Sequence, residues 1–217
     1  MRRLSVIALA LAFVALLIGA MLELGPAAVD LRGPVAAHLV QSGVSHTVTA
    51  VLLNYRGYDT LLEIAVLLLA LLAILAALGD MPDSPTRAAH PVLQTLARLA
   101  APLMIVVAVY LLWAGAFRPG GAFQAGAVLA AAGVLLHLVG LIPGWSLPRL
   151  RLRIGLAAGF VVFLTVAALL LMQGALLKYP PDMAGGLILL IESGLTISLA
   201  LILAGLFLFL SQEEGGS

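Results

Sequence analysis

The sequence predicts an all-α fold, a polytopic transmembrane helical bundle of about six spanning helices. Composition is the first reason, because 63% of the 217 residues are hydrophobic and only 10% are charged. A soluble domain carries about 25% charged residues. The second reason is that the apolar residues gather in long runs, and a spanning helix needs about 20 of them. Backbone polar groups in lipid must be satisfied within the segment, so these runs are expected to be helices rather than the alternating strands of a membrane barrel.

Six apolar runs define the expected helices, and they cover residues 4–22, 61–78, 102–117, 123–142, 154–173 and 185–210. The third run is short for a span unless it begins near Leu96. The first run follows Arg2 and Arg3 and so resembles a signal peptide, but it exceeds the usual hydrophobic length of about 7–15 residues. It also lacks a clean small-residue cleavage site before Glu23. We therefore expect this helix to be retained.

Residues 23–54 form the least regular part of the chain. Pro26, Pro34 and Gly43 interrupt them, and the apolar stretch 44–53 is too short to span a membrane alone. We expect a re-entrant or interfacial helix that leads into the second span. An extended outer loop is one alternative, and a single long helix over 47–78 with a weak point at Gly57 is another.

Residues 80–91, DMPDSPTRAAHP, are the stretch most like a soluble protein and contain three prolines. This composition predicts a cytoplasmic linker. It would join an N-terminal two-helix module, residues 1–79, to a four-helix module, residues 92–217.

Lysine and arginine predict the orientation, because they are enriched in cytoplasmic loops. With the N-terminus inside, the cytoplasmic side carries seven arginines: Arg2, Arg3, Arg87, Arg98, Arg149, Arg151 and Arg153. The outer side then carries four basic residues: Arg32, Arg56, Arg118 and Lys178. The excess favours both termini inside, which agrees with an even number of helices.

The stretch VTAVLLNYRGYDTLLE places Arg56, Asp59 and Glu63 at the entry to the second helix. The two acids share a helix face if the helix reaches back that far. Charged groups at a bilayer are costly, so one interpretation is a cation or proton site whose carboxylates are tuned by the arginine. The alternative is a helix start, in which Asp59 or Thr60 caps the helix and Glu63 faces the positive end of its dipole. Thr60 and Glu63 also have capping-box spacing.

Two further polar residues lie within predicted spans. Glu192, in LILLIESGLTISLALILAG, is far from either end of the sixth helix. An acid at this depth indicates a functional site, and the alternative is a protonated, hydrogen-bonded structural residue. His137, near the cytoplasmic end of the fourth helix, is either a proton relay or a neutral hydrogen-bonded histidine.

The segment GAFRPGGAFQAG, residues 115–126, predicts a tight helix–loop–helix hairpin. Pro119 restricts the backbone, Gly120 and Gly121 permit turn conformations, and Gly126 permits close helix packing. Phosphate binding would require a Walker-type lysine, which this segment lacks.

Composition also excludes several classes of function. The net charge of +1 gives no electrostatic basis for binding nucleic acid. The absence of cysteine excludes disulfides and thiolate catalysis. No pair of histidines has metal-ligand spacing, so we expect no metal site and no cofactor.

Three motifs, taken in order, resemble one family. VTAVLLNYRGYDTLLEIAVLLLALLAI resembles a segment near the C-terminus of the large subunit of Mrp-type cation/proton antiporters. That segment is a small separate subunit in membrane-bound hydrogenases. GAFRPGGAFQAG is similar to the GHxxPGGGFxxG signature of the MnhB domain, the B subunit of the same antiporters. GLILLIESGLTISLALILAG resembles the glutamate-bearing closing helix of that domain.

The resemblance implies a fusion of the small segment to an MnhB domain. It implies ion-path roles for Arg56, Asp59, Glu63 and Glu192. It also implies structural roles for the motif residues Gly57, Gly115, Pro119, Gly120, Gly121, Phe123 and Gly126. The chain departs from the family pattern at four positions: Leu62, Ala116, Phe117 and Ala122.

The implied function is that of a non-enzymatic accessory subunit in the plasma membrane of a bacterium or archaeon. Its partners would be other membrane subunits, the lipid bilayer and Na⁺ or H⁺, which the carboxylates would exchange without covalent chemistry. A sodium site needs several oxygen ligands, so a partner or water would supply part of it. Two alternatives are a structural scaffold and a membrane-arm subunit of a hydrogenase-like, redox-driven ion pump. A stand-alone transporter is disfavoured, because no inverted repeat is visible.

Overall fold

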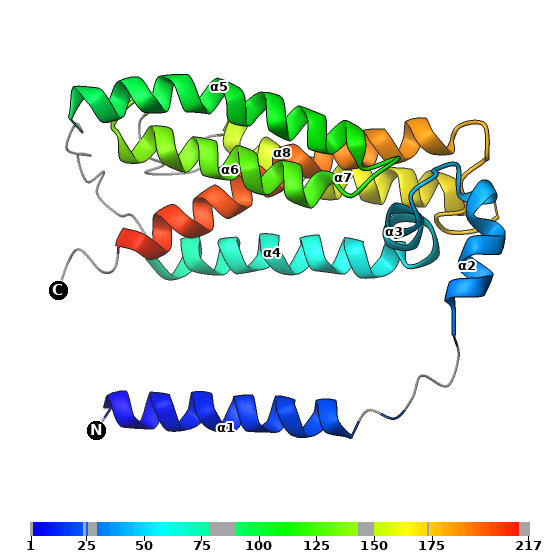
Figure 1. The fold of residues 1–217 in the computed structure, drawn as a ribbon, viewed down its shortest axis with the longest axis horizontal. Coiled ribbons are helices and arrows are strands. Elements are labelled where there is room, and N and C mark those ends of the chain that lie inside the picture. The colour runs from blue at the N-terminus through cyan, green and yellow to red at the C-terminus, as the bar shows by residue number, and fades with distance from the viewer. Residues whose placement is uncertain are drawn as a thin grey trace. The chain divides into compact units, whose positions relative to one another are not determined.

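The structure is a computed structural model that describes residues 2–23, 25, 30–78, 90–142, 150–172 and 174–212. Within these residues all regular structure is helical, which confirms the all-α prediction (Figure 1). The helices are α1 (Arg2–Leu22), α2 (Arg32–His38), α3 (Thr47–Ala50), α4 (Gly57–Leu78), α5 (Pro91–Ala114), α6 (Ala122–Leu138), α7 (Leu150–Met172) and α8 (Ala184–Gln212), with a 3-10 turn at Leu39–Ser42 and a π-helical turn at Val51–Tyr55.

The chain separates into two compact units, Met1–Ala37 and His38–Ser217. In the first unit, α1 confirms the first predicted helix, and its apolar side chains from Ile7 onward are exposed. A helix that is apolar on all sides suits lipid rather than water. At the start of α2, the Arg32 guanidinium pairs with the Asp30 carboxylate at 3.2 Å.

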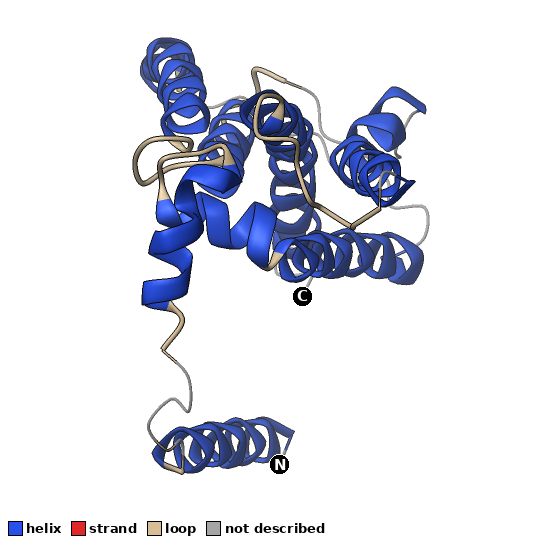
Figure 2. Ribbon diagram, turned by 90° about the vertical axis from the view of Figure 1, so that its right-hand side faces the viewer, coloured by secondary structure: helices blue, strands red, loops and turns tan. Residues whose placement is uncertain are grey.

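The second unit is built around α8, which packs against α4, α5, α6 and α7. Figures 1 and 2 show these five helices running side by side, with α8 in the middle of the group. In the apolar window of α8, 50% of residues are buried, against 17% in α4 and in α5. The outer helices therefore expose apolar side chains, as expected of a bundle surrounded by lipid or by other membrane subunits.

Four helices are long and apolar enough to cross a membrane: Gly57–Ala76, Pro91–Ala114, Leu150–Met172 and Ala184–Leu208. The apolar helices Ile7–Leu22 and Ala122–Leu138 are shorter. The membrane helical bundle is confirmed, whereas the number of six spans stays a prediction.

The predicted start of the third helix, residue 102, is wrong. In the structure α5 starts at Pro91, with Pro102 in its interior, and it ends at Ala114. Proline suits the first helical position because its missing N–H would have had no partner there. The His90 ring also caps this end by accepting a hydrogen bond from the Val92 N–H at 3.4 Å. Phe117 therefore belongs to the turn after α5. Residues 79–89, most of the predicted linker, lie outside the described residues.

The irregular segment before α4 is helical over residues 47–55 and breaks at Arg56, where φ is −126°. An extended loop and a single helix over 47–78 are therefore both wrong. The short helix leading into the second span is observed, while its depth relative to a membrane stays a prediction. The break starts α4 at Gly57, four residues earlier than expected.

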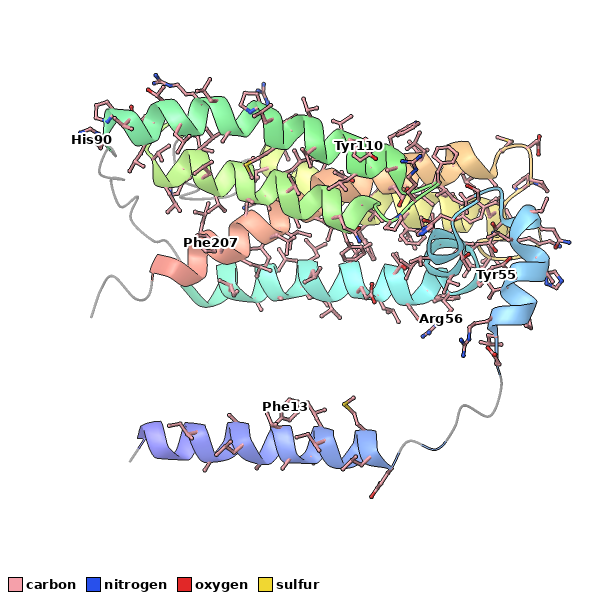
Figure 3. All side chains as sticks on the ribbon, in the orientation of Figure 1. Phe13, Tyr55, Arg56, His90, Tyr110 and Phe207 are labelled. Atoms are coloured by element: carbon pink, nitrogen blue, oxygen red, sulfur yellow. The ribbon has the colours of Figure 1, made fainter. Side chains whose placement is uncertain are left out.

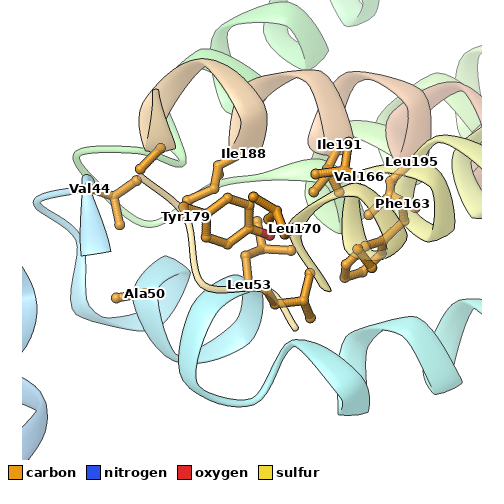
Figure 4. Packing of buried hydrophobic residues seen from close by; sticks show 14 of the residues in the cluster. Val44, Ala50, Leu53, Phe163, Val166, Leu170, Tyr179, Ile188, Ile191 and Leu195 are labelled. Carbon is orange, nitrogen blue, oxygen red and sulfur yellow. The ribbon is translucent and has the colours of Figure 1, made fainter. Parts of the chain in front are cut away.

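A stripe on α8 organises the main core (Figure 4). Ile188, Ile191, Leu195 and Leu199 recur every three or four residues, and each is at most 1% exposed. They belong to one buried cluster with Phe163, Val166 and Leu170 of α7 and with Ala50 and Leu53 of the segment before α4. The segment that carries the first motif is thus anchored on the helix that carries Glu192.

Candidate functional site

Glu192 is buried at the centre of the site, with 5% of its surface exposed. Its carboxyl group receives a backbone hydrogen bond from Ala122. The first N–H groups of a helix lack partners within that helix, so the start of α6 provides donors for this carboxyl. In the adjacent turn of α8, the Thr196 hydroxyl donates to the Glu192 backbone oxygen at 2.8 Å.

The hairpin glycines allow α6 to begin next to this carboxyl. Gly121 has φ +107°, a conformation that disfavours residues with a side chain, and a Cβ atom there would lie 2.8 Å from Glu192 Oε1. Its N–H donates to Leu111 O at 2.8 Å. A Cβ atom at Gly115 would lie 2.7 Å from Gly121 Cα. The turn is therefore closed so tightly that larger residues would displace either the backbone or the carboxyl.

The remaining motif residues have simpler positions. A Cβ atom at Gly126 would lie 2.9 Å from Leu199 Cβ, so this glycine permits the close approach of α6 and α8. Gly57 packs against the Leu177 side chain at the start of α4. Pro119 is exposed in the turn between α5 and α6.

Side-chain and backbone groups of residues 45–49 donate hydrogen bonds to the same hairpin. The Thr49 hydroxyl donates to Gly115 O at 2.5 Å. The Ser45 hydroxyl and the His46 N–H both donate to Ala116 O, each at 3.2 Å. These bonds join the region of the first motif to the region of the second across about 70 residues of sequence.

The hairpin, the short helix, the π-helical turn, α4 and α8 together line a partly open cavity of about 60 Å³ next to Glu192. Its walls include Thr49, Thr60, Gln124 and Phe123. A cavity of this size and polarity has room for a small cluster of water molecules. In the part of the chain that the structure describes, no three His, Cys, Asp or Glu side chains come together as metal ligands.

Asp59 and Glu63 lie on one face of α4, as expected, and line an open groove with Leu62, Val66, Leu67 and Phe123. Arg56 forms an ion pair with Asp59 and so balances that charge. Thr60 does not form the predicted capping box, since its hydroxyl donates to Leu52 O at 2.7 Å, within the π-helical turn. Glu63 therefore faces the groove, with neighbours that are mostly apolar. Figure 3 shows Arg56 and Tyr55 at one end of the second unit and His90 at the other.

His137 is not part of this group. It lies on α6, 13 residues after Gln124, which is about 20 Å along a helix axis. It is buried, and its Nδ1 atom has no hydrogen-bond partner among the described residues. The prediction of a hydrogen-bonded histidine is thus not met at that atom.

Sequence reasoning did not single out Thr49 or Tyr179. Tyr179 packs in the main core beside Leu53 and Leu170, and its hydroxyl has no partner in the described residues (Figure 4). Burial raises the pKa of this hydroxyl, so it stays neutral. Two threonines in an otherwise apolar stretch could have indicated a polar contact at Thr49. No feature of the neighbouring sequence indicated that Tyr179 would be buried.

The fold and site define an all-α membrane protein with a buried carboxyl beneath a glycine-rich hairpin. The family model described as "Domain related to MnhB subunit of Na+/H+ antiporter" matches residues 92–210, more than half of the chain. The chain belongs to this family. A search of curated proteins found no match.

Two solved structures share the fold. A chain of the membrane-bound sulfane sulfur reductase, an archaeal respiratory membrane complex, has a TM-score of 0.74 at 24% identity, over 96% of this chain and 97% of that one. A chain of the Mrp complex from Dietzia sp. DQ12-45-1b has a TM-score of 0.68 at 24% identity. That match covers 94% of this chain but only 25% of the longer relative.

Proposed function

We propose that this chain is a non-catalytic accessory subunit of a multi-subunit monovalent cation/proton antiporter, or of a related ion-translocating complex. The carrying observation is the carboxyl of Glu192, buried within a candidate span next to a cavity large enough for water. Intramembrane acids mark ion and proton routes, because an unpaired charge there is costly to maintain. Membership of the MnhB-related family supports the same function.

Glu63 is the second carboxylate of the proposed route. Asp59 is paired with Arg56, which leaves Glu63 free to bind and release H⁺ or to contact Na⁺ in the groove. The groove is open on the surface of this chain, so neighbouring membrane subunits would complete it. The complex would reside in the plasma membrane of a bacterium or archaeon. The MnhB-like module would comprise residues 92–217, following an N-terminal module and a linker at 80–91.

Transport by vesicles that contain the assembled complex tests this function. We expect Glu63→Gln and Glu192→Gln each to abolish cation-dependent proton movement, because an amide cannot exchange a proton. Glu23→Gln makes the same chemical change at an exposed position after α1 and should leave transport intact. Wild-type transport by the Glu63→Gln and Glu192→Gln variants, at normal complex content, would show that the chain acts only as a scaffold.

A redox-driven ion pump is the second candidate, favoured by the likeness to the archaeal respiratory complex over nearly all of both chains. Purification of the complex from its native membrane, followed by mass spectrometry of its subunits, separates the two. Antiporter subunits alone support the first function, and co-purifying iron–sulfur subunits support the second.

A further inference from the structure

Phe123 lies where two compartments of the second unit meet. Phe123 lines the open groove that contains Glu63, and it also lines the partly open cavity that contains Glu192. It is partly buried and packs against the main core. Phe123 therefore borders two regions that each hold a carboxylate.

The walls on each side of the ring differ in chemistry. On the cavity side, Thr60 and Gln124 offer polar atoms to water. The Thr60 hydroxyl uses its hydrogen in the bond to Leu52 O, so its oxygen is left as an acceptor. On the groove side, Glu63 follows Thr60 by three residues, one turn along the same helix. Helix α4 thus contributes residues to both compartments, as Phe123 does.

A phenyl ring interrupts a chain of hydrogen bonds, because it offers neither a strong donor nor a strong acceptor. Water on either side of Phe123 can carry protons only up to the ring. Rotation of the ring would join the two water-accessible regions.

We propose that Phe123 is the barrier that controls proton transfer between Glu63 and Glu192. This inference rests on the proposed ion-path function. A proton leaves the Glu63 carboxyl group, moves through water when the ring turns aside, and binds the Glu192 carboxylate. One proton is transferred, no bond to carbon changes and no electron moves.

The test measures the decay of an imposed pH gradient in vesicles that contain the assembled complex, without the transported cation. Phe123→Ala should speed this decay about tenfold over wild type, equivalent to a barrier lowered by about 1.4 kcal/mol. Adding Glu63→Gln to that variant should restore the slow decay. Phe123→Trp should instead slow cation-coupled transport, because a larger ring blocks the same gap.

Phe160→Ala is the matched control. Phe160 is also partly buried against the main core, but it lines neither the groove nor the cavity. An equal leak in this variant would mean that loosened packing, and not an opened route, causes the decay. If Phe123→Ala does not assemble, Phe123→Leu keeps an apolar filling and should still leak faster than Phe160→Leu.

The outcomes separate the barrier from the wider function. If the glutamate variants abolish transport while Phe123→Ala stays tight and Phe123→Trp transports normally, the barrier role is wrong and the ion path stands. If none of these variants changes transport or leak, both the barrier and the ion path are wrong.

Discussion

Gly121 sets the geometry of the site through its backbone. Its φ of +107° starts α6 directly beneath Glu192, and a Cβ atom there would lie 2.8 Å from the carboxyl oxygen. We expect Gly121→Ala to destabilise the chain by about 1–3 kcal/mol, the usual cost of a strained backbone position. Transport should fall as well, because the carboxyl must move away from the hairpin. Thermal unfolding and transport of the purified complex measure the two effects.

Gly133→Ala is the control for that prediction. Gly133 lies on the same helix, and a Cβ atom there would meet nothing within 4 Å. Alanine in a helix interior is favoured over glycine by roughly 0.5–1 kcal/mol, so this variant should be neutral or stabilised. Equal destabilisation by the two alanines would contradict the special role given to Gly121.

Thr49 carries a second prediction at this scale. It is buried, and its hydroxyl donates to Gly115 O. Thr49→Val keeps the shape but leaves a buried carbonyl without its partner, which costs about 1–3 kcal/mol. Thr49→Ser should retain most of the stability. Thr165→Val, which removes an exposed bond within one helix, should shift the unfolding temperature much less; a comparable shift would argue against the inter-segment bond.

The sequence predicted local features of the site better than distant ones. The turn at Gly120 and Gly121 and the shared face of Asp59 and Glu63 follow from short-range rules of backbone and helix geometry. The meeting of Glu192 with Ala122 does not, because it depends on how α8 packs across the chain. Helix α8 is apolar over most of its length and carries small or hydroxylated residues on more than one face, so the pattern could not say which face of the helix is buried.

At the scale of the elements, α7 and α8 approach closely at Gly159. A Cβ atom there would lie 2.7 Å from Ser198 Cβ and 2.8 Å from Gly194 O. The Ser198 hydroxyl donates to Leu156 O at 2.5 Å across the same contact. Helices in membranes usually associate through small residues and through hydrogen bonds from hydroxyl groups. Burial of apolar surface contributes little free energy there, because lipid is equally apolar.

We therefore expect Gly159→Ala to force the two helices apart and to lower stability by about 1–3 kcal/mol, as overpacking does. Gly155→Ala, about one turn away, is the comparison. There the new methyl group would meet only the end of the Leu201 side chain, which can rotate away. Unfolding of the purified complex measures both variants, and a loss as large for Gly155→Ala would show that the contact at Gly159 is not special.

Element boundaries show where sequence patterns fail. The apolar pattern alone placed the start of α5 near Pro102, because polar residues between His90 and Leu99 obscured the helix. Proline at the first position and a histidine cap set the true start. The π-helical turn at Val51–Tyr55 left no recognisable signal, since it depends on contacts made by α3 and by Thr60.

At the scale of the whole molecule, the basic residues of the second unit lie near its two ends. The segment before α4, the α5–α6 hairpin and the α7–α8 connection meet at one end, as the bond from Ser45 to Ala116 and the contact of Gly57 with Leu177 show. That end carries Arg56, Arg118 and Lys178. Arg98, Arg151 and Arg153 lie toward the other end, near the starts of α5 and α7.

Because the chain has no cysteine, a single introduced cysteine is its one site for a thiol reagent, which allows this orientation to be tested. Arg151→Cys and Arg118→Cys, each the single cysteine of its variant, replace exposed residues near opposite ends of the bundle. We expect a membrane-impermeant thiol reagent added to intact cells to label position 118 but not position 151, because arginine favours the cytoplasmic side. Inverted vesicles should reverse the pattern. Labelling of position 151 alone from outside would invert the orientation. Labelling of both positions from one side would mean that α6, which lies between them, does not cross the membrane.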